Sequence, residues 1–490
     1  MEKPKSLYYQ IERTKTAACV GSVRADGNIL SGKGVIVGVI DTGIDIFDNA
    51  FRNSDGTTRI LNIYDQTTGE KYDKQSIDEY IRLNEDLSGG TFSYDNAPGV
   101  DNIMHGTDVS YIAAGSLGVA YEADIIAVKM GYSINNQFPR TTSLMDAIDY
   151  IIRKAIEYRK PVAVNISYGC NYGAHNGNTL LESFIDDISK SYRCVICVGS
   201  GNEADKAIHF GGIINTGQVQ TAYLSVGEYQ SAIDIQIWKN YWDTIDVMLI
   251  NPRGEQIGII TEGRINRYET YNTEIITLLG EPSPYNIYQE IYINLIPKTD
   301  YILSGIWQIV LMAGSIRAGE YNIWLPSSQA LGYATAFKNP TADGTITIPA
   351  TARNCIAVGA YNAYTNSYAA FSGRGFDNSI RNVNAGVKPD ITAPGVDISI
   401  ARQRGNDITY RNVTGTSYAV PVVTGAAALL MQWGIVMGND RFMYGEKLKA
   451  ALIDGSKPVG LVGITRNDNQ PDPRTGWGAV CLKNTLNKIL

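Results

Sequence analysis

The chain has 490 residues, 44% of them hydrophobic, which is long enough for two or three domains and a sizeable buried core. Its 42 basic and 49 acidic residues give a net charge of -7 without a dense lysine or arginine run, which argues against nucleic acid as a partner. No uninterrupted apolar stretch approaches the ~18 residues of a membrane span, and the first residues lack the apolar core of an export signal, so we expect no membrane partner.

In the first part of the chain, short apolar runs rich in β-branched residues alternate with amphipathic helical patterns. Buried strands are predicted at 34–40, 123–129, 161–167 and 194–198, and helices at 143–159 and 179–191. The first helix carries its apolar residues at helical spacing: Leu144, Ala147, Ile148, Ile151, Ile152 and Ile156. Strands that alternate with helices predict an α/β fold, a parallel sheet with helices on both faces.

The pattern changes in the middle of the chain. From about 221 to 325, short alternating runs separated by turn signals predict an all-β sandwich of the jelly-roll type. The buried-strand pattern then returns at 354–359, and an apolar helix is predicted at 424–433. The β domain is therefore predicted to be an insertion. The expected organisation is an N-terminal extension at 1–30, an α/β domain at 31–213 and 341–490, and the inserted domain at 214–340.

Six cysteines are sparse for this length and follow no disulfide-framework spacing, so we expect free thiols in a reducing compartment. Cys194 and Cys197 form a C-x-x-C, which could be redox-active or half of a zinc site. They lie in an apolar run of strand length without a second such pair. Buried strand residues are therefore the simpler interpretation.

Three short motifs carry groups that could perform chemistry. Asp41 opens D-T-G-I-D after the first predicted strand, where parallel sheets place their ligand crevice, although turn aspartates are common there. His105 opens a predicted helix in H-G-T, where it could also serve for capping or packing. Ser417 starts the apolar helix in G-T-S-Y-A-V-P, either as a cap or as a nucleophile.

Together these motifs supply what nucleophilic catalysis by serine requires. A serine nucleophile needs a base within hydrogen-bond reach and a carboxylate that fixes the tautomer of the base. Tetrahedral intermediates also need hydrogen-bond donors for the oxyanion. Asn202, in S-G-N-E after a predicted strand, offers a side-chain donor, and the backbone N–H of Ser417 offers another.

In this order, D-T-G-I-D, H-G-T, S-G-N-E and G-T-S-Y-A-V-P resemble the motifs of the subtilisin-like serine proteases. The resemblance covers roughly residues 31–213 and 345–485. It assigns the catalytic roles of that family to Asp41, His105, Asn202 and Ser417. It implies a serine endopeptidase that acts on protein or peptide substrates through an acyl-enzyme and needs no cofactor for its chemistry.

The same resemblance implies substrate contacts from a Ser-x-Gly strand and from one wall of the S1 pocket. The residues so assigned are Ser167, Tyr168, Gly169, Gly199, Ser200 and Gly201. Many members of the family bind structural calcium, for which Asp45 and Asp48 are candidates, but the chain has no D-x-D-x-D-G loop. Members are usually made with a prodomain. Only about thirty residues precede the first predicted strand, so we expect a cleaved prodomain as a partner or folding without one.

A narrower resemblance is to the clostridial germination proteases of the Csp type, which carry a jelly-roll domain between the oxyanion asparagine and the nucleophile. It includes the loops N-Y-G-A-H-N-G and T-A-R-N-C-I-A-V-G-A-Y-N. It implies limited proteolysis that activates a zymogen, in the cytoplasm or associated with the spore. Because some Csp members have lost their triads, a catalytically silent binding or signalling protein is the alternative.

Four further residues raise separate questions. Most relatives have a second histidine where this chain has Asp108, whose carboxylate could raise the pKa of His105 or face solvent, and we expect solvent. His175 and His209 are predicted to stabilise loops near the site by hydrogen bonds, not to contact the substrate. Pro421 is expected near the first turn of its helix, where a missing N–H costs little.

Overall fold

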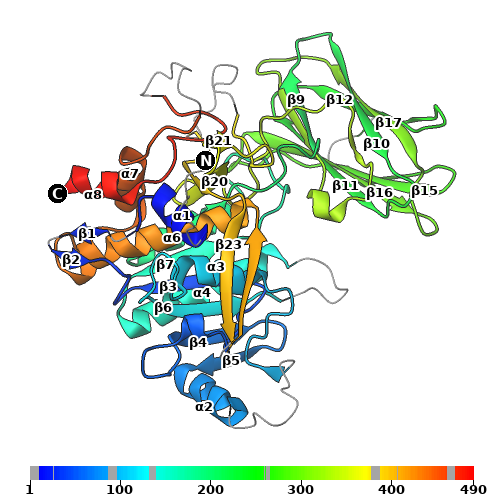
Figure 1. The fold of residues 1–490 in the computed structure, drawn as a ribbon. Coiled ribbons are helices and arrows are strands. Elements are labelled where there is room, and N and C mark those ends of the chain that lie inside the picture. Colours follow the sequence, from blue (N-terminus) through cyan, green and yellow to red (C-terminus); the bar gives the residue numbers. More distant parts are fainter. Residues whose placement is uncertain are drawn as a thin grey trace, which may run out of the picture.

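The computed structural model describes residues 10–490 except 22, 26, 86–95, 132–138, 259, 261–264, 377–386, 405–406 and 461–469. Figure 1 shows an α/β domain and, beside it, a smaller all-β domain formed by a middle part of the chain. The α/β domain is assembled from segments on both sides of the β domain in the sequence. An inserted β domain is therefore present.

The α/β domain is organised around one sheet with the strand order β21-β20-β8-β7-β3-β6-β4-β5, in which β22 also pairs with β20. Its central strands pair in parallel, and only the edge strands β21 and β5 pair antiparallel. The predicted α/β fold is confirmed. The strands are β3 (Ile36–Asp41), β4 (Ile60–Asp65), β5 (Glu70–Asp73), β6 (Asp124–Lys129), β7 (Val162–Ile166), β8 (Cys194–Gly199), β20 (Ile356–Asn362), β21 (Ser367–Tyr368) and β22 (Ile391–Pro394).

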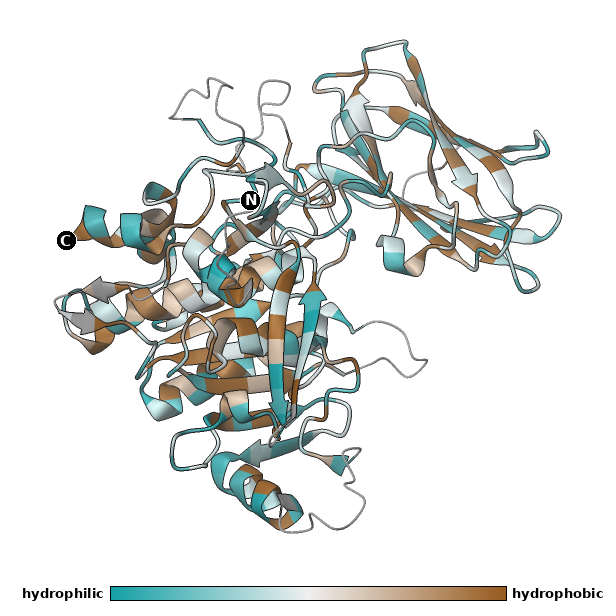
Figure 2. Cartoon of the chain, in the orientation of Figure 1, coloured by the Kyte–Doolittle hydropathy of each residue, from teal (hydrophilic) through white to brown (hydrophobic). Residues whose placement is uncertain are grey.

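Helices cover both faces of this sheet. Because successive side chains of a strand point to opposite faces, Val37 and Val39 of β3 pack with α3 and α6, whereas Ile36 and Ile40 pack with α4 and α5. Figure 2 shows hydrophobic residues concentrated along these central strands and α6. The helices are α1 (Gln10–Ala17), α2 (Lys74–Glu85), α3 (His105–Ala114), α4 (Thr141–Tyr158), α5 (Leu180–Ser191), α6 (Thr416–Met431), α7 (Gly445–Asp454) and α8 (Leu482–Ile489), with shorter helical turns η1 (Asn49–Phe51), η3 (Ser328–Ala330) and η4 (Gln432–Val436).

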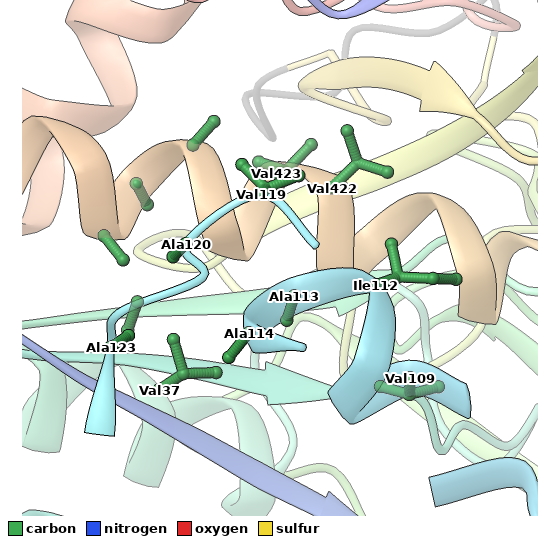
Figure 3. Close-up of a cluster of buried hydrophobic side chains, with 14 of the residues drawn as sticks. Val37, Val109, Ile112, Ala113, Ala114, Val119, Ala120, Ala123, Val422 and Val423 are labelled. Carbon is green, nitrogen blue, oxygen red and sulfur yellow. The ribbon is translucent and has the colours of Figure 1, made fainter. Parts of the chain in front are cut away.

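Helix α6 runs through the core against α3 (Figures 1 and 3). A Cβ on Gly425 would lie 2.5 Å from Cβ of Val119 and 3.0 Å from the carbonyl oxygen of Ala113, so glycine permits this close approach. The helical segment Thr416–Val436 is long and apolar enough to cross a membrane, but 89% of its most apolar window is buried inside the protein. The segment is therefore a core helix of the α/β domain.

The inserted domain consists of two antiparallel sheets, ordered β13-β12-β17-β10-β19 and β14-β15-β16-β11-β18-β9. Leu224 and Trp307 from one sheet and Ile235 and Ile293 from the other share one buried core, so the sheets form a sandwich. Its jelly-roll connectivity and the bounds 214–340 stay predictions. The strands are β9 (His209–Ile213), β10 (Val219–Val226), β11 (Ile233–Asn240), β12 (Ile245–Ile250), β13 (Gln256–Ile257), β14 (Ile265–Glu269), β15 (Thr273–Leu279), β16 (Tyr288–Pro297), β17 (Gly305–Ala313), β18 (Glu320–Trp324) and β19 (Ala336–Phe337).

Several elements were not anticipated from the sequence. They include the two-stranded sheet β1 (Arg24–Ala25) and β2 (Asn28–Ile29), and the hairpin of β23 (Ile398–Arg404) and β24 (Asp407–Val413). Strand β23 alternates buried and exposed residues only weakly and ends at Arg404, and β24 is exposed from Ile408 to Asn412, which is why their sequence lacks a clear strand pattern. The prediction of the apolar helix face was wrong for one residue, because Ile156 of α4 is exposed.

The expectation of free thiols is wrong for two of the six cysteines. Cys19, just after α1, forms a disulfide with Cys481, just before α8, with the Cα atoms 4.8 Å apart. Spacing could not reveal a pair separated by 462 residues. Cys194 and Cys197 are buried on β8 and belong to the cores on opposite faces of the sheet, so they do not form a redox or zinc pair. Their interpretation as buried strand residues is confirmed.

Candidate active site

Asp41 and His105 meet at the carboxyl end of β3. Nδ1 of His105 lies 2.6 Å from Oδ1 of Asp41, which also accepts the backbone N–H of Thr42 at 2.8 Å. Since a carboxylate only accepts, Nδ1 carries the proton and Nε2 is left as the base. A Cβ on Gly106 would collide with the carbonyl oxygen of Gly43 and lie 3.0 Å from Cβ of Asp41. The glycine of H-G-T therefore allows α3 to approach the aspartate.

The surroundings of His105 control its protonation. Burial by itself would lower the pKa of His105, but the charge and hydrogen bond of Asp41 more than offset it, so the pKa is raised from its ordinary value. The carboxylates of Asp101 and Asp108 act in the same direction. The histidine side chain keeps 25% of its surface exposed, while Asp41 is almost fully buried. This combination leaves a base that is accessible on one side and held on the other.

The start of α3 is held by residues that sequence reasoning missed. The fully buried carboxylate of Asp101 accepts the backbone N–H of Met104 at 2.7 Å and that of Thr107 at 2.8 Å, as a helix cap does. Thr42 donates its hydroxyl to Asp101 and accepts the N–H of Gly106. Asp101 lies three residues before the N-cap residue Met104, so the usual capping signal, a polar residue at the N-cap itself, does not mark it in the sequence.

Ser417 lies in the first turn of α6, which begins after Gly415 at a φ of 153°. Pro421 lies inside the helix, beyond the first turn where it was expected. Its missing N–H leaves the carbonyl oxygen of Ser417 without its usual helical partner. That oxygen accepts the hydroxyl of Ser167 at 3.3 Å instead. The proline therefore makes room for a bond between the nucleophile candidate and the predicted substrate strand.

A buried network supports this contact. The side-chain amide of Asn165 donates to Oγ of Ser167 at 3.1 Å, and its oxygen accepts the hydroxyl of Thr424 at 3.1 Å. The ring of Tyr418 lies 5.3 Å from the ring of His105, centroid to centroid. The first turn of α6 is thus tied to β7 on one side and lies beside the Asp41–His105 pair on the other.

Asn202 is held at the same turn. Its Oδ1 accepts the backbone N–H of Thr416 at 3.0 Å and the hydroxyl of Thr416 at 3.1 Å. Because two donors fix the amide oxygen, the orientation of the side chain is determined and the NH₂ group points away from Thr416. Nδ2 lies 3.5 Å from the position that a Cβ on Gly415 would take. The structure therefore brings Asn202 to the start of the helix that carries Ser417.

The six residues that are predicted to contact the substrate differ in how far they are exposed. Ser167 and Tyr168 are half-buried and Gly169 is exposed. Ser200 is fully buried, with Oγ 3.3 Å from Oγ of Ser372, and Gly199 is buried beside Thr416. For these two residues the surroundings are protein interior, because β8 runs under α6. Contact of the six with substrate stays a prediction.

Thr347 lies between the two predicted walls. A Cβ on Gly169 would lie 2.5 Å from Oγ1 of Thr347, and a Cβ on Gly201 would collide with its Cγ2. The backbone N–H of Thr347 also donates to the carbonyl oxygen of Ser200 at 3.0 Å. No motif marks this threonine, which follows the inserted domain in the chain. Glycine is therefore needed at positions 169 and 201, because the segment that contains Thr347 approaches both of them closely.

Asp108 does not face solvent, so the expectation for this residue was wrong. It is fully buried, accepts Nε of Arg402 at 3.0 Å and also pairs with Arg411. Arg402 donates to the carbonyl oxygen of Met104 at 2.8 Å as well. Both arginines come from the β23–β24 hairpin, which the sequence did not reveal. Because the hairpin was not predicted, its two arginines could not be identified as partners of Asp108.

The candidate calcium ligands face the same hairpin. Oδ2 of Asp45 accepts Nε of Arg404 at 2.7 Å, and Oδ1 of Asp48 accepts the N–H of Ala50 at 2.9 Å. Burial raises the pKa of Asp48 to about 6. The described residues contain no group of three or more His, Cys, Asp or Glu side chains that could hold a metal ion. The guanidinium of Arg404 on Asp45 stands where a calcium ion would have to bind this carboxylate, and a positive side chain there does not fit a calcium site at this pair.

The other two histidines lie at the junction with the β domain. Nδ1 of His175 lies 2.7 Å from the carbonyl oxygen of Ile346, and Nε2 of His209 lies 3.0 Å from Oδ1 of Asn322. Their rings stack on Trp324 from β18, at centroid distances of 4.1 and 4.9 Å. The predicted hydrogen-bonding role is confirmed for both, although His209 begins β9 and is not in a loop. Burial lowers the pKa of His175 to about 4.

Comparison with known proteins places these features in a family. The family model described as "Subtilase family" matches residues 32–283 and 321–478. Two curated relatives are the subtilase-type proteinase RRT12 of Saccharomyces cerevisiae, 33% identical over 128 residues, and the subtilisin-like protease 10 of Arthroderma otae, 34% identical over 120 residues. These matches cover 26% and 24% of this chain and 23% and 27% of the relatives, about a quarter of their length.

One solved structure is similar over nearly the whole molecule. The Clostridium perfringens CspB protease matches with a TM-score of 0.86 and 34% identity, covering 96% of each chain. Its coverage includes the inserted domain as well as the α/β domain. Since the family model spans more than half of the residues and the motifs lie together in the fold, the chain belongs to the subtilase family of subtilisin-like serine proteases.

Proposed function

We propose that this protein is a serine endopeptidase that hydrolyses peptide bonds of protein substrates. In this proposal Ser417 is the nucleophile, His105 the general base, Asp41 the residue that orients the base, and Asn202 a donor to the oxyanion. The observation that carries it is the 2.6 Å contact between His105 and Asp41 beside the first turn of α6. Membership of the subtilase family supports the same reaction.

Acylation follows from the protonation of His105. With Nδ1–H donated to Asp41, the lone pair of Nε2 accepts the proton of Ser417 Oγ as that oxygen bonds to the substrate carbonyl carbon. The amide of Asn202 and the backbone N–H of Ser417 donate to the oxyanion, and the helix N-terminus favours its charge. The carbon–nitrogen bond then breaks, and His105 gives its proton to the leaving amine.

Deacylation repeats these steps with water. His105 takes a proton from water as the hydroxide oxygen bonds to the acyl carbon, and the ester bond to Ser417 breaks with return of that proton to Oγ. The enzyme is regenerated without a redox change. The protein groups that exchange protons in these steps are His105 and Ser417, and Asp41 holds the histidine in place.

A finer proposal concerns the substrate. The resemblance to the Csp-type germination proteases implies limited proteolysis that activates a zymogen, in association with the spore, and the similarity to the CspB protease over both domains supports that resemblance. The Cys19–Cys481 disulfide argues against a reducing cytoplasm, because disulfides persist in oxidising compartments. Profiling of cleavage in a peptide library, followed by a search for the preferred site in candidate zymogens, tests this. Broad cleavage without sequence preference would argue against it.

The first experiment separates an enzyme from a silent binding protein. A fluorophosphonate probe should label the wild-type protein at Ser417, and mass spectrometry should locate the adduct in the peptide that contains G-T-S-Y-A-V-P. Ser417→Ala should remain unlabelled while folding normally. A folded wild-type protein that resists the probe would support the catalytically silent alternative.

A further inference from the structure

The segment that leaves β18, residues 324–328, contacts the α/β domain on both sides of the candidate active site. We call it the exit segment. Trp324 is almost fully buried, with its indole N–H donated to the carbonyl oxygen of Gly344 at 2.9 Å. The segment belongs to the inserted domain, because β18 pairs with β11 and β9 in one sheet of the sandwich. It is therefore the place where the inserted domain could influence the chemistry.

The first contact is with the loop at 170–178, which follows the predicted substrate strand. His175 stacks on Trp324, and the side-chain amide of Asn171 donates to the carbonyl oxygen of Leu325 at 3.3 Å. The N–H of Gly173 donates to Oε1 of Gln236 on β11 at 2.7 Å. The inserted domain thus holds the chain just after Gly169.

The second contact is with Glu203, the residue after Asn202. Oε1 of Glu203 accepts the hydroxyl of Ser327 at 2.9 Å and that of Ser328 at 3.2 Å, and Oε2 accepts the N–H of Ser328 at 3.0 Å. Glu203 is buried, and a buried carboxylate is costly unless hydrogen bonds satisfy it. Within the described part of the chain, the donors to this carboxylate belong to the exit segment.

Asn202 is consequently held from two sides. Its own Oδ1 is bound by Thr416 at the start of α6, and its neighbour Glu203 is bound by the exit segment. On the other side of Asn202, Gly201 has a φ of +91°, a conformation that favours glycine, and its carbonyl oxygen accepts the N–H of Gly373 at 2.9 Å. Beyond Asn202, the N–H of Ala204 donates to the carbonyl oxygen of Phe371 at 3.1 Å. The backbone on either side of Asn202 is therefore bound by residues 371–373, and the Glu203 carboxylate adds a side-chain anchor directly beside the amide.

We propose that Glu203, held by Ser327 and Ser328, is a positioning residue that keeps Asn202 aimed at the oxyanion, so that the inserted domain contributes to the rate of catalysis. The inference rests on the proposed protease function. It differs from a purely stabilising role of the inserted domain, because it predicts an effect on transition-state binding that passes through one named side chain.

The test is a double-mutant cycle between the exit segment and Asn202, measured on a chromogenic peptide substrate. Ser327→Ala with Ser328→Ala removes two hydroxyl donors and leaves the Ser328 N–H. We expect kcat to fall roughly tenfold with KM unchanged, because small displacements of catalytic groups cost rate and not ground-state binding. In the Asn202→Ala background, the same pair of changes should produce no further loss.

Two controls make the cycle specific. Ser327→Thr keeps the hydroxyl donor and should retain kcat, and Ser315→Ala removes an exposed serine at the opposite end of β18 and should change nothing. An equal loss of kcat with and without Asn202 would overturn the proposal, as would a lowered Tm at unchanged kcat. If the wild-type protein is neither active nor labelled by a fluorophosphonate, the protease proposal fails first and the inference fails with it.

Discussion

Asp108 lies one turn after His105 on α3, and its buried carboxylate accepts Nε of Arg402 at 3.0 Å. This pair joins the helix of the catalytic base candidate to the β23–β24 hairpin, and Arg411 adds a second link from the same hairpin. The carboxylate also acts on His105 through its charge, in the direction that raises the pKa of the histidine. The pair therefore links a structural contact to the pH dependence of the proposed reaction.

The first prediction concerns that pH dependence. His105 acts as a base only when neutral, and its pKa is raised from its ordinary value, so kcat/KM should rise with pH through a midpoint above that of an unperturbed histidine. Asp108→Asn removes a negative charge that favours the imidazolium, so the midpoint should move to lower pH. Rate profiles between pH 5 and 9 measure this. Asp187→Asn, at an exposed carboxylate of α5, is the control, and an unmoved or raised midpoint in Asp108→Asn would contradict the prediction.

The second prediction concerns Gly106. A Cβ at this position would collide with the carbonyl oxygen of Gly43 and press on Asp41. Gly106→Ala should therefore separate His105 from Asp41 and lower kcat/KM by about 100-fold, the usual cost of a misplaced catalytic group. Gly21→Ala, where an added Cβ meets nothing within 4 Å, should retain wild-type activity. Retained activity in Gly106→Ala would show that α3 can shift without harm.

The third prediction concerns the Cys19–Cys481 disulfide. It joins segments 462 residues apart and so restricts the unfolded chain strongly. Its removal should lower the free energy of unfolding by about 2–4 kcal/mol. Denaturant titrations with and without dithiothreitol measure the change in wild type and in Cys19→Ser. Dithiothreitol should destabilise only the wild type, and equal sensitivity of both proteins would assign the effect to another cause.

The fourth prediction concerns Trp324, which lies between the rings of His175 and His209. Trp324→Ala should leave a cavity at the junction of the two domains and lower the free energy of unfolding by about 3–5 kcal/mol. The matched control is Trp242→Ala, because Trp242 is 43% exposed, and it should cost about 1 kcal/mol or less. Similar losses in both variants, measured by thermal and urea unfolding, would contradict the prediction that burial of Trp324 at the junction stabilises the protein.

The substitution Asn202→Ala provides the reference for the predicted changes in kcat. Loss of an oxyanion donor in this family is known to lower kcat by about 10²–10³-fold, and we expect the same loss in Asn202→Ala. The variant should still fold, because Thr416 keeps its place at the start of α6. Active-site labelling with a fluorophosphonate should become slower but remain measurable. A rate equal to wild type would remove Asn202 from the proposed mechanism.

Much of this architecture could be predicted because its signals are local. The strand at 34–40 and the helix at 143–159 carry periodic apolar residues, and the structure contains β3 and α4 there. Asp41, His105, Asn202 and Ser417 could be selected because each stands in a short motif with its neighbours. The hairpin at 398–413 was missed, since its alternation of buried and exposed residues is weak and its function depends on distant partners.

Sequence alone determined which chemical groups are available and which elements carry them, because periodicity and motifs are properties of neighbouring residues. Only the tertiary structure decided what those groups contact. Asp108 was expected in solvent and lies in an ion pair with Arg402, 294 residues away, and Cys19 found Cys481 across almost the whole chain. Glu203 likewise depends on serines that follow more than a hundred residues later. Such contacts arise when separately predictable elements pack, and packing energies between distant segments leave no local pattern in the sequence.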